Sequence, residues 1–413
     1  MLVVLETPAD LIFPTSREAH TPEGLIEGIF NVEHLFARLN QQGVRLDGEE
    51  LAYSLIKAYW PEVAPAIEFV THRRIPASKL AALAIRAALT TRDDEKLAGT
   101  MGISQIRAMA NRHGSDPRHQ TKRAVVLDYL TAGDGGQGSL ASACALVDRW
   151  LAFDPDTNAD GLPPVLVSSI ARSSTDIYLL LLVLAGYPAL AAGSDDQEWR
   201  RAVIGLATIA HWFGEDKGKI ANAVWTASRV EANATTIRQG LKQASENRWL
   251  APPLNPDELK KYLGLPGDEE SLKGWKWWKS LIGAKPQEVR EEWGRYLWST
   301  VGKTIWNREL LLYAQRNFLF EHFPDYDPSR KDLWENHNRP WDFDHIHAQA
   351  YFYNKKDGSP FREICGEFGN IIGNLRAWPM EENRSDQKST AFEKMDDQQQ
   401  FQSFVLPTEV TAF

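Results

Sequence analysis

The chain has 413 residues, of which 43% are hydrophobic and 24% charged, a composition typical of soluble globular proteins and not of disordered or fibrous ones. The formal net charge of −9 argues against a protein that coats nucleic acid nonspecifically, but not against a nuclease, whose site is itself acidic and binds a cation. Two cysteines are too few for a disulfide framework, and no apolar run reaches the roughly 18 residues of a membrane helix. We therefore expect a cytoplasmic protein with no membrane partner.

The first three quarters of the sequence predict helices, because apolar residues recur there at three- and four-residue spacing. After two N-terminal helices that begin near Thr21 and Asp47, the segments with this period are Ser78–Leu89, Ile103–Asn111, Ala124–Leu130, Ala141–Leu151, Glu198–Phe213 and Ile220–Ala227. Loops rich in Gly, Pro or Asp separate them, and no repeat of fixed length is apparent. The pattern predicts a mostly helical body over about residues 1–300.

The pattern changes after Trp341. Residues 342–347 are short and extended, and residues 371–378 are strand-like around a Gly-Asn pair. Asn383 then opens a polar helix that we expect to continue through Ser389, Phe392 and Met395. Strand, loop, strand and helix within some fifty residues predict a ββα unit. We therefore expect a mostly α protein in which a small α+β domain, at about 301–413, follows the helical body.

Three short motifs in this region are the elements of an HNH nuclease: Asp344-His345-Ile346, Gly373-Asn374-Leu375 and Glu382-Asn383-Arg384-Ser385. Metal-assisted phosphodiester hydrolysis needs a base for the attacking water and a cation on the scissile phosphate. Neighbouring side chains of a strand point to opposite faces, so Asp344 and His345 can separate into a metal ligand and a general base. Asn383 can return its side-chain oxygen to the same ion, for which oxygen ligands favour Mg²⁺ or Mn²⁺.

Asn374 completes the predicted site by pinning the connecting segment and orienting the imidazole. Asn374 and Asn383 lie nine positions apart, as the two asparagines do in the HNH domains of RNA-guided DNA nucleases. Arg384 and Lys388 lie one turn apart on the predicted helix and are candidate DNA phosphate contacts, with a solvated helix face as the alternative. The alternative for the whole set is a chance collection of turn asparagines and one strand histidine.

The sequence also resembles a family. Residues 338–346 and 372–378 are similar to the C-terminal nuclease domain of GmrSD-like bacterial defence proteins. Residues 35–46, with Glu50-Leu51 and residues 54–57 after them, are similar to the end of that family's N-terminal nucleotide-hydrolysing domain. The resemblance implies a metal-dependent DNA endonuclease in defence against phage or other foreign DNA. It also implies three regions: a remnant of the nucleotide-hydrolysing domain at 1–95, a helical body at 96–300 and the HNH domain at 301–413.

Two departures from the family pattern matter. The Asp-Gly-Gln-Gln-Arg motif of the family is absent, and Gln315-Arg316 is the only Gln-Arg pair in the chain, so we expect no nucleotide hydrolysis. The proline usual after Asp-His-Ile is replaced by His347-Ala348, which removes no ligand. The alternative function is a non-catalytic DNA-binding or regulatory subunit that docks a partner protein carrying the missing nucleotide domain. A second copy of the chain is a further candidate partner.

Two other features have alternative interpretations. His347 lies two residues from His345, so we expect both side chains to project from the same strand face. His347 is then either an auxiliary ligand or phosphate contact, or a polar residue near the edge of the site. Residues 273–279 interleave lysines with Trp275, Trp277 and Trp278. Such a run can stack bases, but we expect mainly a buried seam.

Overall fold

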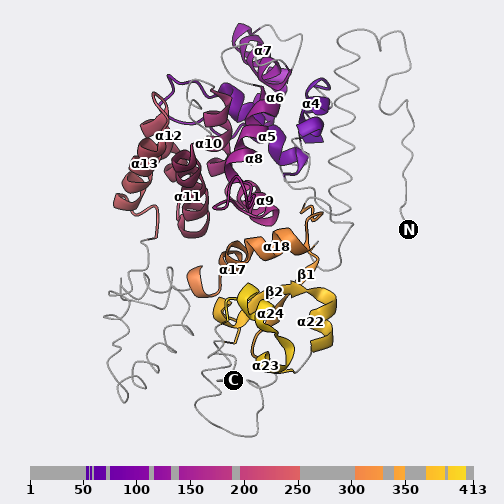
Figure 1. Cartoon of the computed structure of the whole chain (residues 1–413). Coiled ribbons are helices and arrows are strands. Elements are labelled where there is room, and N and C mark those ends of the chain that lie inside the picture. The colour runs from indigo at the N-terminus through magenta and orange to yellow at the C-terminus, as the bar shows by residue number, and fades with distance from the viewer. Residues whose placement is uncertain are drawn as a thin grey trace, which may run out of the picture. The chain divides into compact units, whose positions relative to one another are not determined.

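The computed structural model describes residues 53–54, 56–57, 60–70, 75–110, 116–131, 139–187, 196–251, 303–328, 339–348, 369–386 and 389–405. In this part of the chain the protein is mostly helical, and its one sheet has two antiparallel strands (Figure 1). This agrees with the predicted mostly α class. The predicted N-terminal helices near Thr21 and Asp47, apart from a few residues of the second, and the Trp-rich segment lie outside the described residues.

The helices before residue 251 are α4 (Val63–Val70), α5 (Ala77–Leu89), α6 (Ile103–Ala110), α7 (Pro117–Thr131), α8 (Leu140–Leu151), α9 (Pro164–Ser173), α10 (Thr175–Gly186), α11 (Gln197–Phe213), α12 (Lys217–Ser228) and α13 (Ala234–Glu246). From residue 303 onward the elements are α17 (Arg308–Ala314), α18 (Arg316–His322), β1 (Trp341–His345), a 3₁₀ turn η2 (Ile372–Asn374), β2 (Leu375–Pro379), α22 (Met380–Asp386), α23 (Ala391–Lys394) and α24 (Asp397–Gln402).

Helical periodicity predicted α5, α6, α8 and α11 to within one residue at each end. Helix α7 begins at Pro117, seven residues before the predicted start, because its first turns are polar and carry no apolar period. Asp116 accepts a hydrogen bond from the backbone N–H of Arg118 (2.9 Å) and so caps this early start. The sequence pattern did not predict helix α10, because its residues are apolar on every face and show no helical period. In the structure residues 177–185 are each at most 5% exposed.

The chain forms two compact units, which we describe separately. The first contains residues 1–148, 178–192 and 229–232. Its described part holds α4, α5, α6 and α7, with α7 packed against the other three. The second contains residues 149–177, 193–228 and 233–413, and includes β1, β2 and every described helix after α10. The functional domain boundaries predicted from the sequence stay a prediction.

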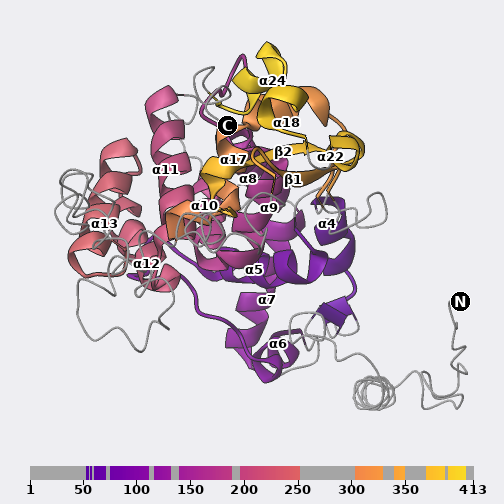
Figure 2. The ribbon, with the colours of Figure 1, turned by 90° about the horizontal axis from the view of Figure 1, so that it is seen from below.

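In the second unit, α12 and α13 form the closest helix pair, side by side in Figures 1 and 2. Gly240 of α13 permits this approach, since a Cβ there would lie 2.5 Å from the Cα of Val224. Asn233 begins α13 with a capping box, in which its side chain accepts from the N–H of Thr236 (2.9 Å). Helix α11 packs on α13 and completes a three-helix layer.

Helix α17 is joined to this helical layer by a partly buried polar network around Glu309. One carboxylate oxygen of Glu309 accepts from Nε2 of His211 (2.8 Å) and Nε1 of Trp212 (2.7 Å), and the other accepts from Ser169. Nδ1 of His211 is in turn hydrogen-bonded to the hydroxyl of Ser174 (2.6 Å). Burial raises the pKa of Glu309, but the hydrogen bond and charge of His211 and the hydrogen bonds from Ser169 and Trp212 lower it by more, so the pKa lies below its ordinary value. The network fixes α17 against α9 and α11.

Across the described residues, no single helix is both long and apolar enough to cross a membrane, although α9 and α10 pass such a test together as a bent pair.

Candidate functional site

Strands β1 and β2 form the framework of the candidate site. They pair antiparallel, with Asp344 opposite Arg376 and His345 opposite Leu375. The first four residues of β2 are buried on both faces, and Trp378 stacks on Phe318 of α18 with ring centroids 5.1 Å apart. The strand-like segment predicted at 371–378 was too long: a 3₁₀ turn occupies 372–374, and the strand begins at Leu375.

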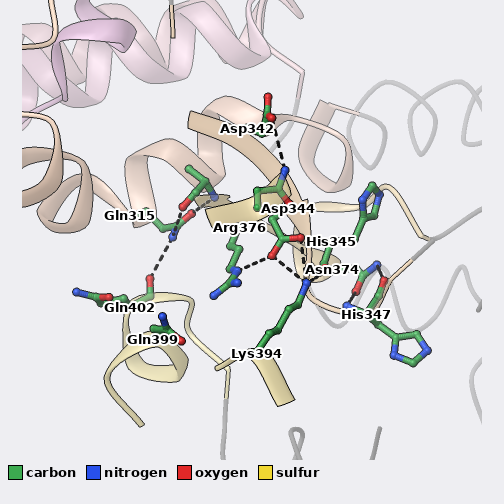
Figure 3. Close-up of polar contacts among 12 residues, drawn as sticks. Gln315, Asp342, Asp344, His345, His347, Asn374, Arg376, Lys394, Gln399 and Gln402 are labelled. Atoms are coloured by element: carbon green, nitrogen blue, oxygen red, sulfur yellow. Dashed lines mark hydrogen bonds and ion pairs between the residues drawn. The ribbon is translucent and has the colours of Figure 1, made fainter. Parts of the chain in front are cut away.

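Gln315, between α17 and α18, is hydrogen-bonded to the edge of β2 that does not pair with β1. Its side-chain oxygen accepts from the backbone N–H of Ala377 (2.7 Å), and its side-chain nitrogen donates to the carbonyl of Gln402 (3.2 Å; Figure 3). Gln315 is 1% exposed. The amide thus satisfies a backbone group that a third strand would otherwise pair with, and it sets the position of β2 relative to α17 and α24.

His345 ends β1 and points to the face opposite Asp344, as strand alternation requires. Its Nε2 lies 2.9 Å from Oδ1 of Asn370. An amide oxygen only accepts hydrogen bonds, so Nε2 carries the proton, and the neutral imidazole has its lone pair on Nδ1. The geometry therefore leaves Nδ1 as the atom that can accept a proton.

Asn374 clamps the end of β1 to the turn that precedes β2. Its side-chain oxygen accepts from the backbone N–H of His347 (2.8 Å), and its nitrogen donates to the carbonyls of His347 (3.1 Å) and Gly369 (2.8 Å). Asn370 follows directly after Gly369, so the clamp also fixes the residue that holds His345. These contacts are of the kind expected for the pinning role of Asn374; its catalytic role stays a prediction.

His347 does not share the face of His345. The strand ends at His345, so the two-residue period does not extend to His347, and in Figure 3 the two rings point in different directions. Burial, followed by the positive charge of Lys394, lowers the pKa of His347. Its backbone, not its ring, makes the contacts with Asn374 described above.

Asp344 lies in a buried ion cluster. One of its oxygens accepts from Nε of Arg376 (2.7 Å), and Nζ of Lys394 is 3.0 Å from both oxygens. The same ammonium donates to the carbonyl of His345 (2.7 Å). The exposed fractions of the side chains of Arg376, Lys394 and Asp344 are 0%, 2% and 7%. Two cations therefore neutralise one carboxylate at the position predicted for a metal ligand.

Asn383 does not meet Asp344 and instead lies beside Asp342. Its side-chain nitrogen is 3.5 Å from a carboxylate oxygen of Asp342, a long contact at the limit of a hydrogen bond. The prediction that Asn383 opens a helix was wrong, since α22 begins at Met380 and ends at Asp386. Pro379 ends β2, and Glu381 and Glu382 favour an early start because acidic groups stabilise the first turn. Phe392 belongs to a separate helix, α23.

The residues present do not fit a divalent ion between Asp344 and Asn383 in this arrangement. Both oxygens of Asp344 contact cationic nitrogens, and Asn383 makes its contact with a different carboxylate. Among the residues that the structure describes, no group of three or more His, Cys, Asp or Glu side chains can hold a metal ion. A bound ion would require a rearrangement of these side chains.

Two arginines flank Phe343, on the strand face that carries His345. The guanidinium carbons of Arg308 and Arg339 lie 4.8 and 5.1 Å from the ring centroid, within cation–π range. Burial lowers the pKa of Arg339; the carboxylate of Asp342 raises it and the charge of Arg308 lowers it. Arg376 and Lys394 are buried against Asp344, whereas Arg308 is exposed and Arg339 is half-buried.

The sequence did not reveal three residues of this site: Asn370, Arg376 and Lys394. Arg376 had a weak signal, as a charged residue within an otherwise apolar strand, and Lys394 had none, because it lies fifty residues from its partner. The predicted DNA contacts are not tested: Arg384 belongs to α22 but its side chain is outside the described atoms, and Lys388 is outside the described residues. No protein-family model, curated protein or solved structure significantly matches the chain.

Proposed function

We propose that the chain is an HNH-type endonuclease that hydrolyses phosphodiester bonds of DNA, and that it acts in bacterial defence against foreign DNA. The observation that carries the proposal is the fixed orientation of His345. This residue ends β1 with its Nε2 hydrogen-bonded to Asn370, and Asn374 joins that end of the strand to the turn before β2. The order β1, β2, α22 is that of a ββα unit. The defence role rests on the resemblance of residues 338–346 and 372–378 alone.

In this proposal His345 is the general base. Its Nδ1 takes a proton from water, and the water oxygen bonds to phosphorus. The bond from phosphorus to the leaving sugar oxygen breaks with its electron pair going to that oxygen, which takes a proton from solvent. Arg308 and Arg339 suit the negative charge of a phosphodiester backbone, which supports an anionic substrate. A divalent ion, Mg²⁺ or Mn²⁺, is proposed from the motif, but we assign it no step because Asp344 is held by Lys394 and Arg376.

The second candidate is a non-catalytic DNA-binding or regulatory subunit. The neutralised carboxylate of Asp344 favours it, because a carboxylate that already contacts two cations is a poor ligand for a third. In that case the exposed Arg308 and the half-buried Arg339 contact DNA, and a partner protein supplies the chemistry.

The two candidates differ in whether the chain alone nicks supercoiled plasmid. The purified full chain is incubated with plasmid and Mg²⁺ or Mn²⁺, with and without a nucleoside triphosphate. We expect nicked circles from the unaltered chain and a rate about 10²–10⁴-fold lower from His345→Ala. His119→Ala is the matched control, since His119 lies on α7 with a side chain that is 40% exposed.

A His345→Ala rate equal to that of the unaltered chain would reject the nuclease assignment. Binding of the plasmid without nicking under every condition would favour the non-catalytic subunit.

A further inference from the structure

Lys394 has contacts that a surface lysine does not make. Its ammonium has three donors, and three oxygens accept from it: both carboxylate oxygens of Asp344 at 3.0 Å and the carbonyl of His345 at 2.7 Å. The side chain is 2% exposed. Immobilising and dehydrating a lysine is costly, so the surrounding segments must hold it there.

Two features of the chain deliver Lys394 to this position. Lys394 is the last residue of the short helix α23, and the next residue, Met395, is buried against Ile346 at the exit of β1. Asp396 then caps α24, accepting from the N–H of Gln399 (2.8 Å) in a capping box. The backbone on the C-terminal side of Lys394 is thus fixed against the segment that carries Asp344 and His345.

The chemistry of the position is that of a cation site. It consists of a carboxylate and a backbone carbonyl, which are oxygen acceptors of the kind that bind Mg²⁺ or Mn²⁺ in proteins. Here an ammonium contacts all of these oxygens, and Arg376 adds a second positive charge to the same carboxylate. A divalent ion at Asp344 would meet both like charges at close range.

We propose that Lys394 is the resident cation of this site and competes with divalent metal ions for Asp344. The inference builds on the proposed function, because it concerns the carboxylate beside the general base. It places at Asp344, next to the backbone carbonyl of His345, the positive charge that the motif would assign to a metal ion. It also predicts that any divalent ion bound by the unaltered chain does not depend on Asp344.

The test measures Mn²⁺ binding to the full chain by calorimetric titration, without DNA. Lys394→Met removes the ammonium but keeps a long side chain, and Arg376 remains to pair Asp344, so the carboxylate is not left alone in the interior. We expect this variant to bind Mn²⁺ at least about tenfold more tightly than the unaltered chain, because a nearby like charge is removed. Lys394→Arg, which keeps the charge, should show no gain. Lys394→Met combined with Asp344→Asn should lose the gain.

A second measurement does not require the Lys394 variants to fold. Mn²⁺ affinities of the unaltered chain and of Asp344→Asn should be equal, because Lys394 already holds Asp344. A loss of affinity in folded Asp344→Asn would overturn the proposal, and so would an unchanged affinity in folded Lys394→Met. Neither result depends on plasmid nicking, so a failure here is distinct from a failure of the nuclease assignment.

Discussion

Replacing Gln315 by Leu should loosen β2, because the substitution keeps the bulk of the side chain and removes its amide. Leu has no acceptor in place of Oε1, so the buried backbone N–H of Ala377, which donates to Oε1 of Gln315 at 2.7 Å, loses its partner. A buried unsatisfied donor costs about 1–3 kcal/mol. The carbonyl of Gln402 loses a weaker contact at 3.2 Å and is half-buried, so it adds less. We expect a loss of about 2 kcal/mol in local stability.

Hydrogen exchange of the peptide that contains Ala377 measures this loss directly. A destabilisation of about 2 kcal/mol corresponds to roughly 30-fold faster exchange, since about 1.4 kcal/mol is tenfold in an equilibrium constant. Gln239→Leu is the matched control, because Gln239 is exposed on α13 and the substitution leaves β2 untouched. Exchange of β2 in Gln315→Leu within about twofold of the unaltered chain would refute the view that this amide completes the sheet edge.

Asn374→Ala should lower the free energy of unfolding by about 1–3 kcal/mol and slow plasmid nicking. If urea unfolding and the nicking rate both match those of the unaltered chain, Asn374 does not hold the end of β1 as described. Arg339→Gln, assayed by DNA binding at several salt concentrations, should weaken affinity and reduce the salt slope by about one, whereas Arg238→Gln on the exposed part of α13 should not. Glu309→Gln should lower stability at pH 7 by about 1.5–3 kcal/mol. Because the pKa of Glu309 is lowered in the folded state, this difference should shrink as the pH falls through the lowered pKa, and a difference independent of pH would count against the network. Trp275→Ala should lower the melting temperature more clearly than it weakens DNA binding, and the reverse would show that the Trp-rich run stacks bases.

The sequence was most informative where a single local rule determined the structure. Apolar periodicity located α5, α6, α8 and α11, and strand alternation placed Asp344 and His345 on opposite faces. Both rules act over a few residues, so they need no knowledge of what packs where.

The sequence was least informative where distant segments meet. Lys394 reaches Asp344 across fifty residues, and Gln315 reaches Ala377 across sixty-two, and no periodicity records either approach. The start of α22 was misplaced for a related reason: Asn383 is a good capping residue by type, but the end of β2 at Pro379 decides where the helix begins. Asn370 was overlooked because its role depends on the turn geometry that Asn374 creates.

The contact of Gln315 with β2 also bears on how this region could pass between proteins by gene fusion. A recombination point just before β1 would separate the sheet from the amide that completes its edge, and would leave a backbone donor open to pairing with other chains. A recombination point before α17 would carry Gln315 along with the strands and with the aromatic ring of Phe318 that stacks on Trp378. The side chain of Gln315 therefore decides where the transferable module begins, and this boundary lies earlier in the chain than the strands and the motifs.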